Sequence, residues 1–211
     1  MAGVRRFLIA SSLARIIRKE RGVEARIVEG HFPGQFGRTH FVSIEPGHAF
    51  LVLTDVNVEG GLAEERAEVP PGHAEALLEV AGGRIGYERS RVPLGEGLEA
   101  VLSRFIQPSG LDVLTVVFED GSETFAPPIW FGPEVTGDPA WQRHTIALSG
   151  PPEVPNIALI NQAVEALLRT IESPAGAAAR LGDWLARGSR TQGHELGSLD
   201  ARGGESVSRR N

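Results

Sequence analysis

The stretch Trp130-Phe131-Gly132-Pro133-Glu134-Val135-Thr136-Gly137-Asp138-Pro139 is the most distinctive part of this 211-residue sequence. Within it, Asp138 before Pro139 predicts the cap of a turn or short helix. Upstream, strand-like runs outnumber helical ones, and turn signals recur roughly every 8 to 15 residues, close to the spacing of all-β folds. Downstream, the longest run has helical periodicity. The stretch therefore follows the last strand of a β-rich region.

The β-rich region consists of runs with alternating or β-branched residues, separated by turn signals such as Glu45-Pro46-Gly47-His48. The predicted strands are 4–9, 24–31, 39–44, 49–56, 62–69, 84–92, 98–107 and 111–119. Short helices are predicted at 13–21 and 73–81. This order favours an α+β fold, an antiparallel sheet or barrel with a few helices, over a doubly wound parallel sheet.

The C-terminal part has a different character. Residues 156–173 carry an apolar stripe at helical spacing, and a second short helix is predicted at 177–186. The stretch 188–211 is rich in Ser, Gly and Arg, which predicts a disordered tail. The predicted organisation is a barrel at 1–150, a helical extension at 151–187 and the tail at 188–211.

The composition narrows the classes of function. The net charge of −6 gives no reason to expect a nucleic-acid partner or an acidic membrane. The chain has no cysteine, which excludes disulfides and thiolate metal sites, and it has no apolar run long enough to span a bilayer. We therefore expect a cytoplasmic protein. The six histidines lack zinc-ligand spacing, and no Ser/His/Asp nucleophile motif occurs.

The quoted stretch resembles the closing W-(I/L/F)-G-x-E-V-T-x-D motif of CYTH domains, the triphosphate-tunnel family. Three further segments agree in order with that family: Arg6-Phe7-Leu8-Ile9, Glu29-Gly30-His31-Phe32 and Ser90-Arg91-Val92-Pro93. They resemble the family's opening strand, its Q-G-Y-L strand and its K-x-R-Y-x-V strand. The resemblance covers roughly residues 4–148 and implies an eight-stranded antiparallel barrel of the tunnel type with flanking helices.

The family includes inorganic, thiamine and RNA triphosphatases and class IV adenylate cyclases. The resemblance implies that basic tunnel residues hold a triphosphate and that acidic residues bind magnesium or manganese. This division agrees with general chemistry, because guanidinium groups donate paired hydrogen bonds to phosphate and hard divalent ions prefer carboxylate oxygens.

Many positions that are charged in the family are neutral here. The two opening acids fall on Ala2 and Val4, and the late acid pair falls on Thr115 and Val117. Other expected charges fall on Phe41, Ser43, Thr54 and Ser103. Because strand side chains alternate, these positions share the inner face with the charges that remain. The interior therefore lacks the grouped acids that a divalent ion requires.

The remaining inward charges form the candidate site. The predicted anion-binding residues are Arg6, Arg66, Arg89 and Arg91, and the candidate acidic residues are Glu64, Glu68 and Glu134. An alternative stays open, in which Arg89 and Arg91 form salt bridges to Glu64 or Glu68. Glu134 could likewise pair with an arginine instead of binding a metal.

The sequence predicts a CYTH-like protein with a degenerate tunnel and no catalytic residues, which needs no metal or other cofactor. It would bind an anionic ligand such as a phosphorylated small molecule, or a protein partner through residues 156–173. The alternative is a metal-dependent triphosphate hydrolase or a class IV-type adenylate cyclase, with Mg²⁺ or Mn²⁺ as cofactor.

Overall fold

The computed structural model describes residues 3–35, 38–56, 62–118 and 125–173. Eight strands form one antiparallel sheet in the order β1-β8-β7-β6-β2-β3-β4-β5. The strands are β1 (Gly3–Leu8), β2 (Ala25–Gln35), β3 (Arg38–Glu45), β4 (His48–Val56), β5 (Leu62–Glu68), β6 (Gly83–Gly95), β7 (Leu98–Gln107) and β8 (Asp112–Phe118). The predicted antiparallel sheet of eight strands is confirmed.

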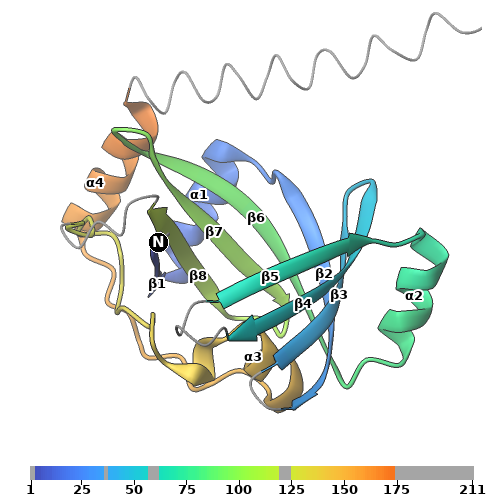
Figure 1. Ribbon diagram of the computed structural model, residues 1–211. Coiled ribbons are helices and arrows are strands. Elements are labelled where there is room, and N and C mark those ends of the chain that lie inside the picture. The colour runs from blue at the N-terminus through green and yellow to red at the C-terminus, as the bar shows by residue number, and fades with distance from the viewer. Residues whose placement is uncertain (1–2, 36–37, 57–61, 119–124, 174–211) are drawn as a thin grey trace, which may run out of the picture.

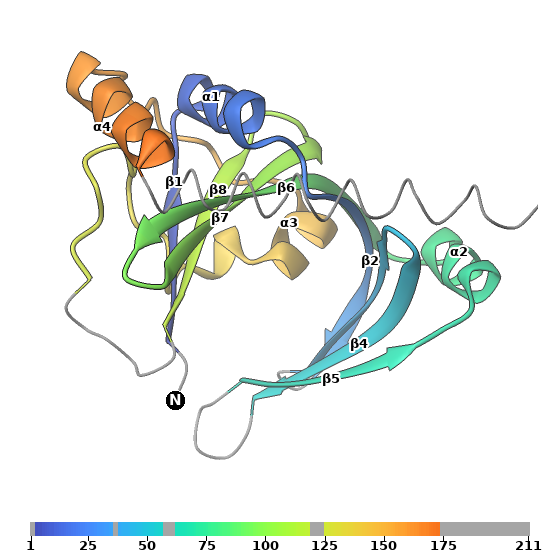
Figure 2. The same cartoon turned by 90° about the horizontal axis from the view of Figure 1, so that it is seen from above.

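The sheet curls strongly, so that its two edge strands, β1 and β5, approach the same side of the molecule (Figures 1 and 2). Within the described residues, no ladder of backbone hydrogen bonds joins these edges. The curl gives the sheet a concave inner face and a convex outer face. Alternation along each strand then decides which side chains point inward.

Three helices cover the outer face. Helices α1 (Ser11–Arg21) and α4 (Asn161–Glu172) lie over β1, β8, β7 and β6, and α2 (Pro71–Glu79) packs against β3 and β4 (Figure 2). The core under α1 and α4 contains Ile17, Leu114 and Leu167, each no more than 1% exposed. Burial of these apolar side chains holds the helices on the sheet.

A short 3₁₀ helix, η1 (Pro139–Trp141), leads into α3 (Arg143–Ser149), which packs inside the curl against β2 and β6 (Figure 2). No helix was predicted from the sequence at the position of α3. The predicted cap at Asp138 is confirmed, because its side chain accepts a hydrogen bond from the Ala140 amide. Trp141 and Ile146 pack with inward-facing side chains of the sheet. One end of the concave space is therefore filled by this segment.

The helix predicted at 156–173 begins later than expected. Residues 151–160 have no regular secondary structure, and α4 starts only at Asn161. Ile157 packs against the core from this irregular segment instead of from a helix. The apolar stripe of α4 is buried in the chain's own core through Ala163, Leu167 and Ile171. The predicted helix at 177–186 and the predicted tail lie outside the described residues.

Within the described ranges, none of the helices has both the length and the hydrophobicity that crossing a bilayer requires.

Candidate functional site

A cavity of about 200 Å³ opens on the concave face of the sheet. Strands β1, β6, β7 and β8 form its walls, and η1 and α3 close it from inside the curl. Polar and apolar groups both line it: Arg6, Tyr87, Arg89, Val101, Ser103, Phe105, Val113, Thr115, Trp141 and Arg143. Three of these side chains are cationic and none is acidic, so the cavity favours an anion.

The strand register explains why these residues meet. Arg6 on β1 lies opposite Thr115 on β8, which in turn lies opposite Val101 on β7. Two residues further along β7, Ser103 lies opposite Arg89 on β6. Because paired residues in an antiparallel ladder project to the same face, the two arginines and the two hydroxyl groups point into one space.

The charges of Arg6 and Arg89 are only weakly compensated by acidic groups of the described residues. Arg6 forms no ion pair with any described residue, and burial, followed by the nearby charge of Arg143, lowers its pKa. The Nε–H group of Arg89 is buried without a hydrogen-bond acceptor among the described residues, and a carboxylate oxygen of Glu24 lies 3.7 Å away. These guanidinium groups therefore keep hydrogen-bonding capacity for a ligand.

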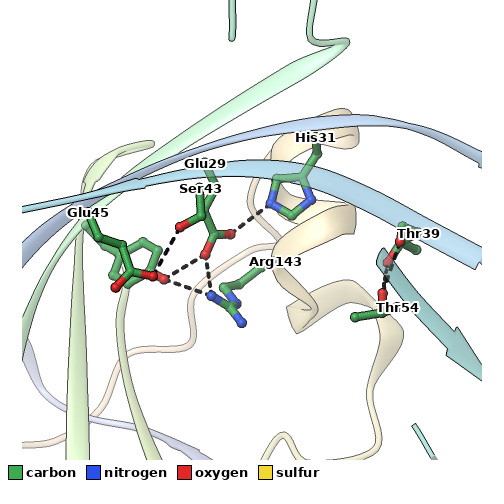
Figure 3. A network of polar contacts seen from close by, with 8 residues as sticks. Glu29, His31, Thr39, Ser43, Glu45, Thr54 and Arg143 are labelled. Carbon is green, nitrogen blue, oxygen red and sulfur yellow. Dashed lines mark hydrogen bonds and ion pairs between the residues drawn. The ribbon is translucent and has the colours of Figure 1, made fainter. Parts of the chain in front are cut away.

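The third arginine, Arg143, is held by a buried network on β2 and β6 (Figure 3). Arg143 donates to Oε1 of Glu29, and it also donates to the Tyr87 hydroxyl at 2.7 Å. The Tyr87 hydroxyl donates to the same oxygen of Glu29 at 2.7 Å, while His31 Nε2 lies 2.9 Å from Oε2. Glu29 is only 1% exposed. The network fixes Arg143 at the inner end of the cavity.

The ionisation of this network follows from its contacts. Burial alone would raise the pKa of Glu29, but the charge of Arg143 and the hydrogen bond and charge of His31 outweigh it and lower that pKa. The charge of Glu29 in turn raises the pKa of Arg143. Burial, reinforced by Glu29, raises the pKa of the Tyr87 phenol. At neutral pH the network is a carboxylate, a guanidinium and a neutral phenol.

Solved structures with a similar fold support the architecture. The crystal structure of the inorganic triphosphatase NE1496 matches with a TM-score of 0.52 and 22% identity, covering 72% of this chain and 97% of that one. A second crystal structure of NE1496, described there as a hypothetical protein, matches with the same score and identity over 100% of its length. The chain has the triphosphate-tunnel fold.

The PH1012 protein from Pyrococcus horikoshii matches this fold more weakly, with a TM-score of 0.42 and 14% identity over 58% of this chain and 82% of that one. No protein-family model matches the sequence. No curated protein matches it either.

The tunnel brings together two of the four arginines predicted from the sequence. Arg6 and Arg89 line the cavity, and Arg66 and Arg91 do not. Arg66 on β5 donates to Glu45 at 2.7 Å and lies 4.3 Å over the Phe50 ring. Its charge is therefore neutralised on the opposite half of the sheet.

Arg91 pairs with Glu24 and Glu99 and not with Glu64 or Glu68. It donates to Glu24 at 2.8 Å and lies 3.3 Å from Glu99. The expected pairing of Arg89 and Arg91 with Glu64 or Glu68 is wrong, because β5 lies at the far edge of the tunnel sheet while Glu24 directly precedes β2, the neighbour of β6.

The three predicted acidic residues do not meet. Glu64 and Glu68 lie on β5, where Glu68 is 2.9 Å from His48, and Glu64 is one of the charges that raise the pKa of Arg143. Glu134 lies beside β1, forms a bidentate pair with Arg5 at 2.6 and 2.9 Å, and accepts from Thr136.

The Glu134 carboxylate belongs to the outer face of the tunnel sheet, because its bridge partner Phe7 and its ion partner Arg5 both project outward. The hydrogen bond from Arg5, together with that from Thr136, lowers the pKa of Glu134 to about 2. The alternative that Glu134 pairs with an arginine is confirmed.

Among the residues that the structure describes, no three His, Asp or Glu side chains are grouped so that they could hold a metal ion. Of the inward carboxylates, Glu29, Glu45 and Glu68 each have a cationic or histidine partner, and Glu64 stands apart on β5 without an ion pair to a described residue. The described donor set of the tunnel therefore does not fit a divalent cation, which needs several oxygen ligands at one point.

Two members of the site were missed in the sequence. Arg143 follows the closing motif, where no repeat, periodicity or charge pattern marks it. Glu29 stands in a segment that resembles a family strand, but nothing in the sequence links it to Arg143, 114 positions away. Tyr87 lies two residues before Arg89 on β6, and its contact with Glu29 gives it a role in holding the network.

Proposed function

We propose that this chain binds a phosphorylated small molecule in the tunnel and does not hydrolyse it by a metal-dependent reaction. The observation that carries the proposal is the convergence of Arg6, Arg89 and Arg143 on one cavity whose lining contains no carboxylate. Guanidinium groups donate paired hydrogen bonds to phosphate oxygens, and hydroxyl groups such as those of Ser103 and Thr115 add further donors.

The distribution of carboxylates supports the non-catalytic part of the proposal. A metal-dependent phosphoryl transfer needs an ion that polarises the phosphate and activates water. In the described part of the chain, the inward acids Glu29 and Glu45 pair with arginines, and Glu68 lies beside His48. Using Glu29 or Glu45 as a metal ligand would leave the half-buried guanidinium group of Arg143 or Arg66 without its partner.

A second candidate function is hydrolysis of a triphosphate with Mg²⁺ or Mn²⁺, favoured by the similarity to NE1496, which is described as an inorganic triphosphatase. In that case Glu64 and Glu68 would have to supply ligands together with residues outside the described ranges. Docking of a protein through residues 156–173 stays a prediction.

Binding is tested by calorimetric titration of the full chain with inorganic phosphate and with tripolyphosphate. Replacing Arg89 with glutamine removes one charged donor, and loss of a charge-assisted hydrogen bond predicts about 10- to 100-fold weaker binding. Arg91→Gln is the matched control, because Arg91 lies two residues along the same strand and is already paired with Glu24 and Glu99. It should change the dissociation constant by no more than about twofold.

Turnover is measured in the same preparations with tripolyphosphate and ATP, each with Mg²⁺ and with Mn²⁺. We expect no hydrolysis or cyclisation above background. Turnover at ordinary enzyme rates would refute the non-catalytic part and support the second candidate function. Absence of binding by any phosphate compound, or equal effects of Arg89→Gln and Arg91→Gln, would refute the binding site itself.

A further inference from the structure

One wall of the cavity is apolar. Phe105, Val113 and Trp141 line it and belong to one buried apolar cluster with Tyr87, whose ring centroid lies 5.5 Å from that of Phe105. A bare inorganic anion forms no favourable contact with such a wall and loses hydration beside it. A ligand that carries an apolar group could bury that group there. The wall therefore selects for an organic substituent.

The charge of the cavity indicates how many negative charges it can neutralise. Arg6, Arg89 and Arg143 contribute three positive charges, and Glu29 cancels one of them through its contact with Arg143. Glu24 lies 3.7 Å from Arg89 but is hydrogen-bonded to Arg91, so two positive charges remain for a ligand. A phosphate monoester carries about −1.5 to −2 at pH 7. The longer tripolyphosphate carries more charge than this set neutralises, and the described residues show no grouped metal ligands that would hold a compensating cation.

We infer that the ligand is an organic phosphate monoester with a small apolar substituent. Its phosphate contacts Arg6, Arg89 and Arg143, and its substituent lies against the wall formed by Phe105, Val113 and Trp141. This inference rests on the proposed binding function and specifies the class of ligand.

The experiment compares phenyl phosphate, inorganic phosphate and tripolyphosphate in calorimetric titrations of the full chain without divalent metal. We expect phenyl phosphate to bind at least about tenfold more tightly than either inorganic anion, because only its ring removes apolar surface from water. Val113→Thr keeps the side-chain volume and adds a hydroxyl group to the wall. It should weaken binding of phenyl phosphate about three- to tenfold and leave inorganic phosphate within about twofold.

Val117→Thr is the matched control, because Val117 is a β-strand valine that does not line the cavity and is 53% exposed. It should leave all three dissociation constants unchanged. Tripolyphosphate or inorganic phosphate binding as tightly as phenyl phosphate, with sensitivity to Arg89→Gln retained, would refute the ligand class and leave the anion site standing. Failure of all three compounds to bind would refute both proposals.

Discussion

Replacement of Glu29 by glutamine tests whether the buried network holds the inner end of the tunnel together. Glu29 is 1% exposed and receives hydrogen bonds from Arg143 and Tyr87. Glutamine keeps an acceptor for Tyr87 but removes the charge opposite Arg143. Breaking a fully buried ion pair costs about 3–5 kcal/mol. Because the Arg143 side chain is 41% exposed and can be hydrated, we expect a loss of about 2–3 kcal/mol.

The assay is urea unfolding at pH 7, with the slope of the transition checked for constancy. Glu45→Gln is the control, because Glu45 pairs with Arg66 at a half-exposed site where the loss should stay below about 1 kcal/mol. A loss for Glu29→Gln no larger than that of the control would refute the view that this carboxylate organises the site.

The stability difference between wild type and Glu29→Gln should also depend on pH. The pKa of Glu29 in the folded chain is lowered from its ordinary value of 4.5, so its stabilising contribution is present above that value. The contribution is lost as the pH falls through the lower folded pKa, because the folded carboxylate must then take up a proton. The stability difference between wild type and Glu29→Gln should shrink between pH 5 and the acid limit of folding. A constant difference would contradict the assignment of a charged Glu29.

Three further outcomes follow from the packing and the ion pairs. Glu134→Gln should cost less than about 1 kcal/mol in urea unfolding and leave phosphate binding unchanged, because the pair with Arg5 is exposed and faces outward. A change in the dissociation constant above about twofold would contradict the outward placement of Glu134. Gly83→Ala should cost about 3 kcal/mol of unfolding free energy and weaken phosphate binding. The added Cβ would lie 2.0 Å from the Ala147 carbonyl oxygen and displace α3. Wild-type stability of this variant would disprove the contact. Leu167→Ala should cost about 2–5 kcal/mol, measured by the same unfolding, with wild-type phosphate affinity after correction for the folded fraction.

The strands were predictable because their signals are local. Alternation and turn residues gave all eight strands to within a few positions, as in the hairpin of β3 and β4 across the turn at 45–48. The inward positions of Arg6 and Arg89 came from the family resemblance, and the register places both in the cavity.

What the sequence did not reveal depends on contacts between distant segments. Helix α3 has only seven residues, too few for a clear periodic pattern, and its position inside the curl is set by packing of Ile146 against the sheet. The site residue Arg143 belongs to that helix, so its role could not be read from neighbouring residues. The helix start near 156 was predicted too early because Ile157 continues the apolar stripe of the helix in the sequence. In the structure it reaches the core from a segment without regular secondary structure.

The pairing of the first strand with the last has a consequence for synthesis on the ribosome. Leu8 and Val113 are ladder partners although more than a hundred residues separate them. At translation rates of about 5–20 residues per second, β1 waits roughly 5 to 20 seconds for its partner to be made. During that time its apolar residues must be shielded by α1 or by a chaperone, and the nascent chain cannot yet hold a ligand, because Arg143 emerges later still.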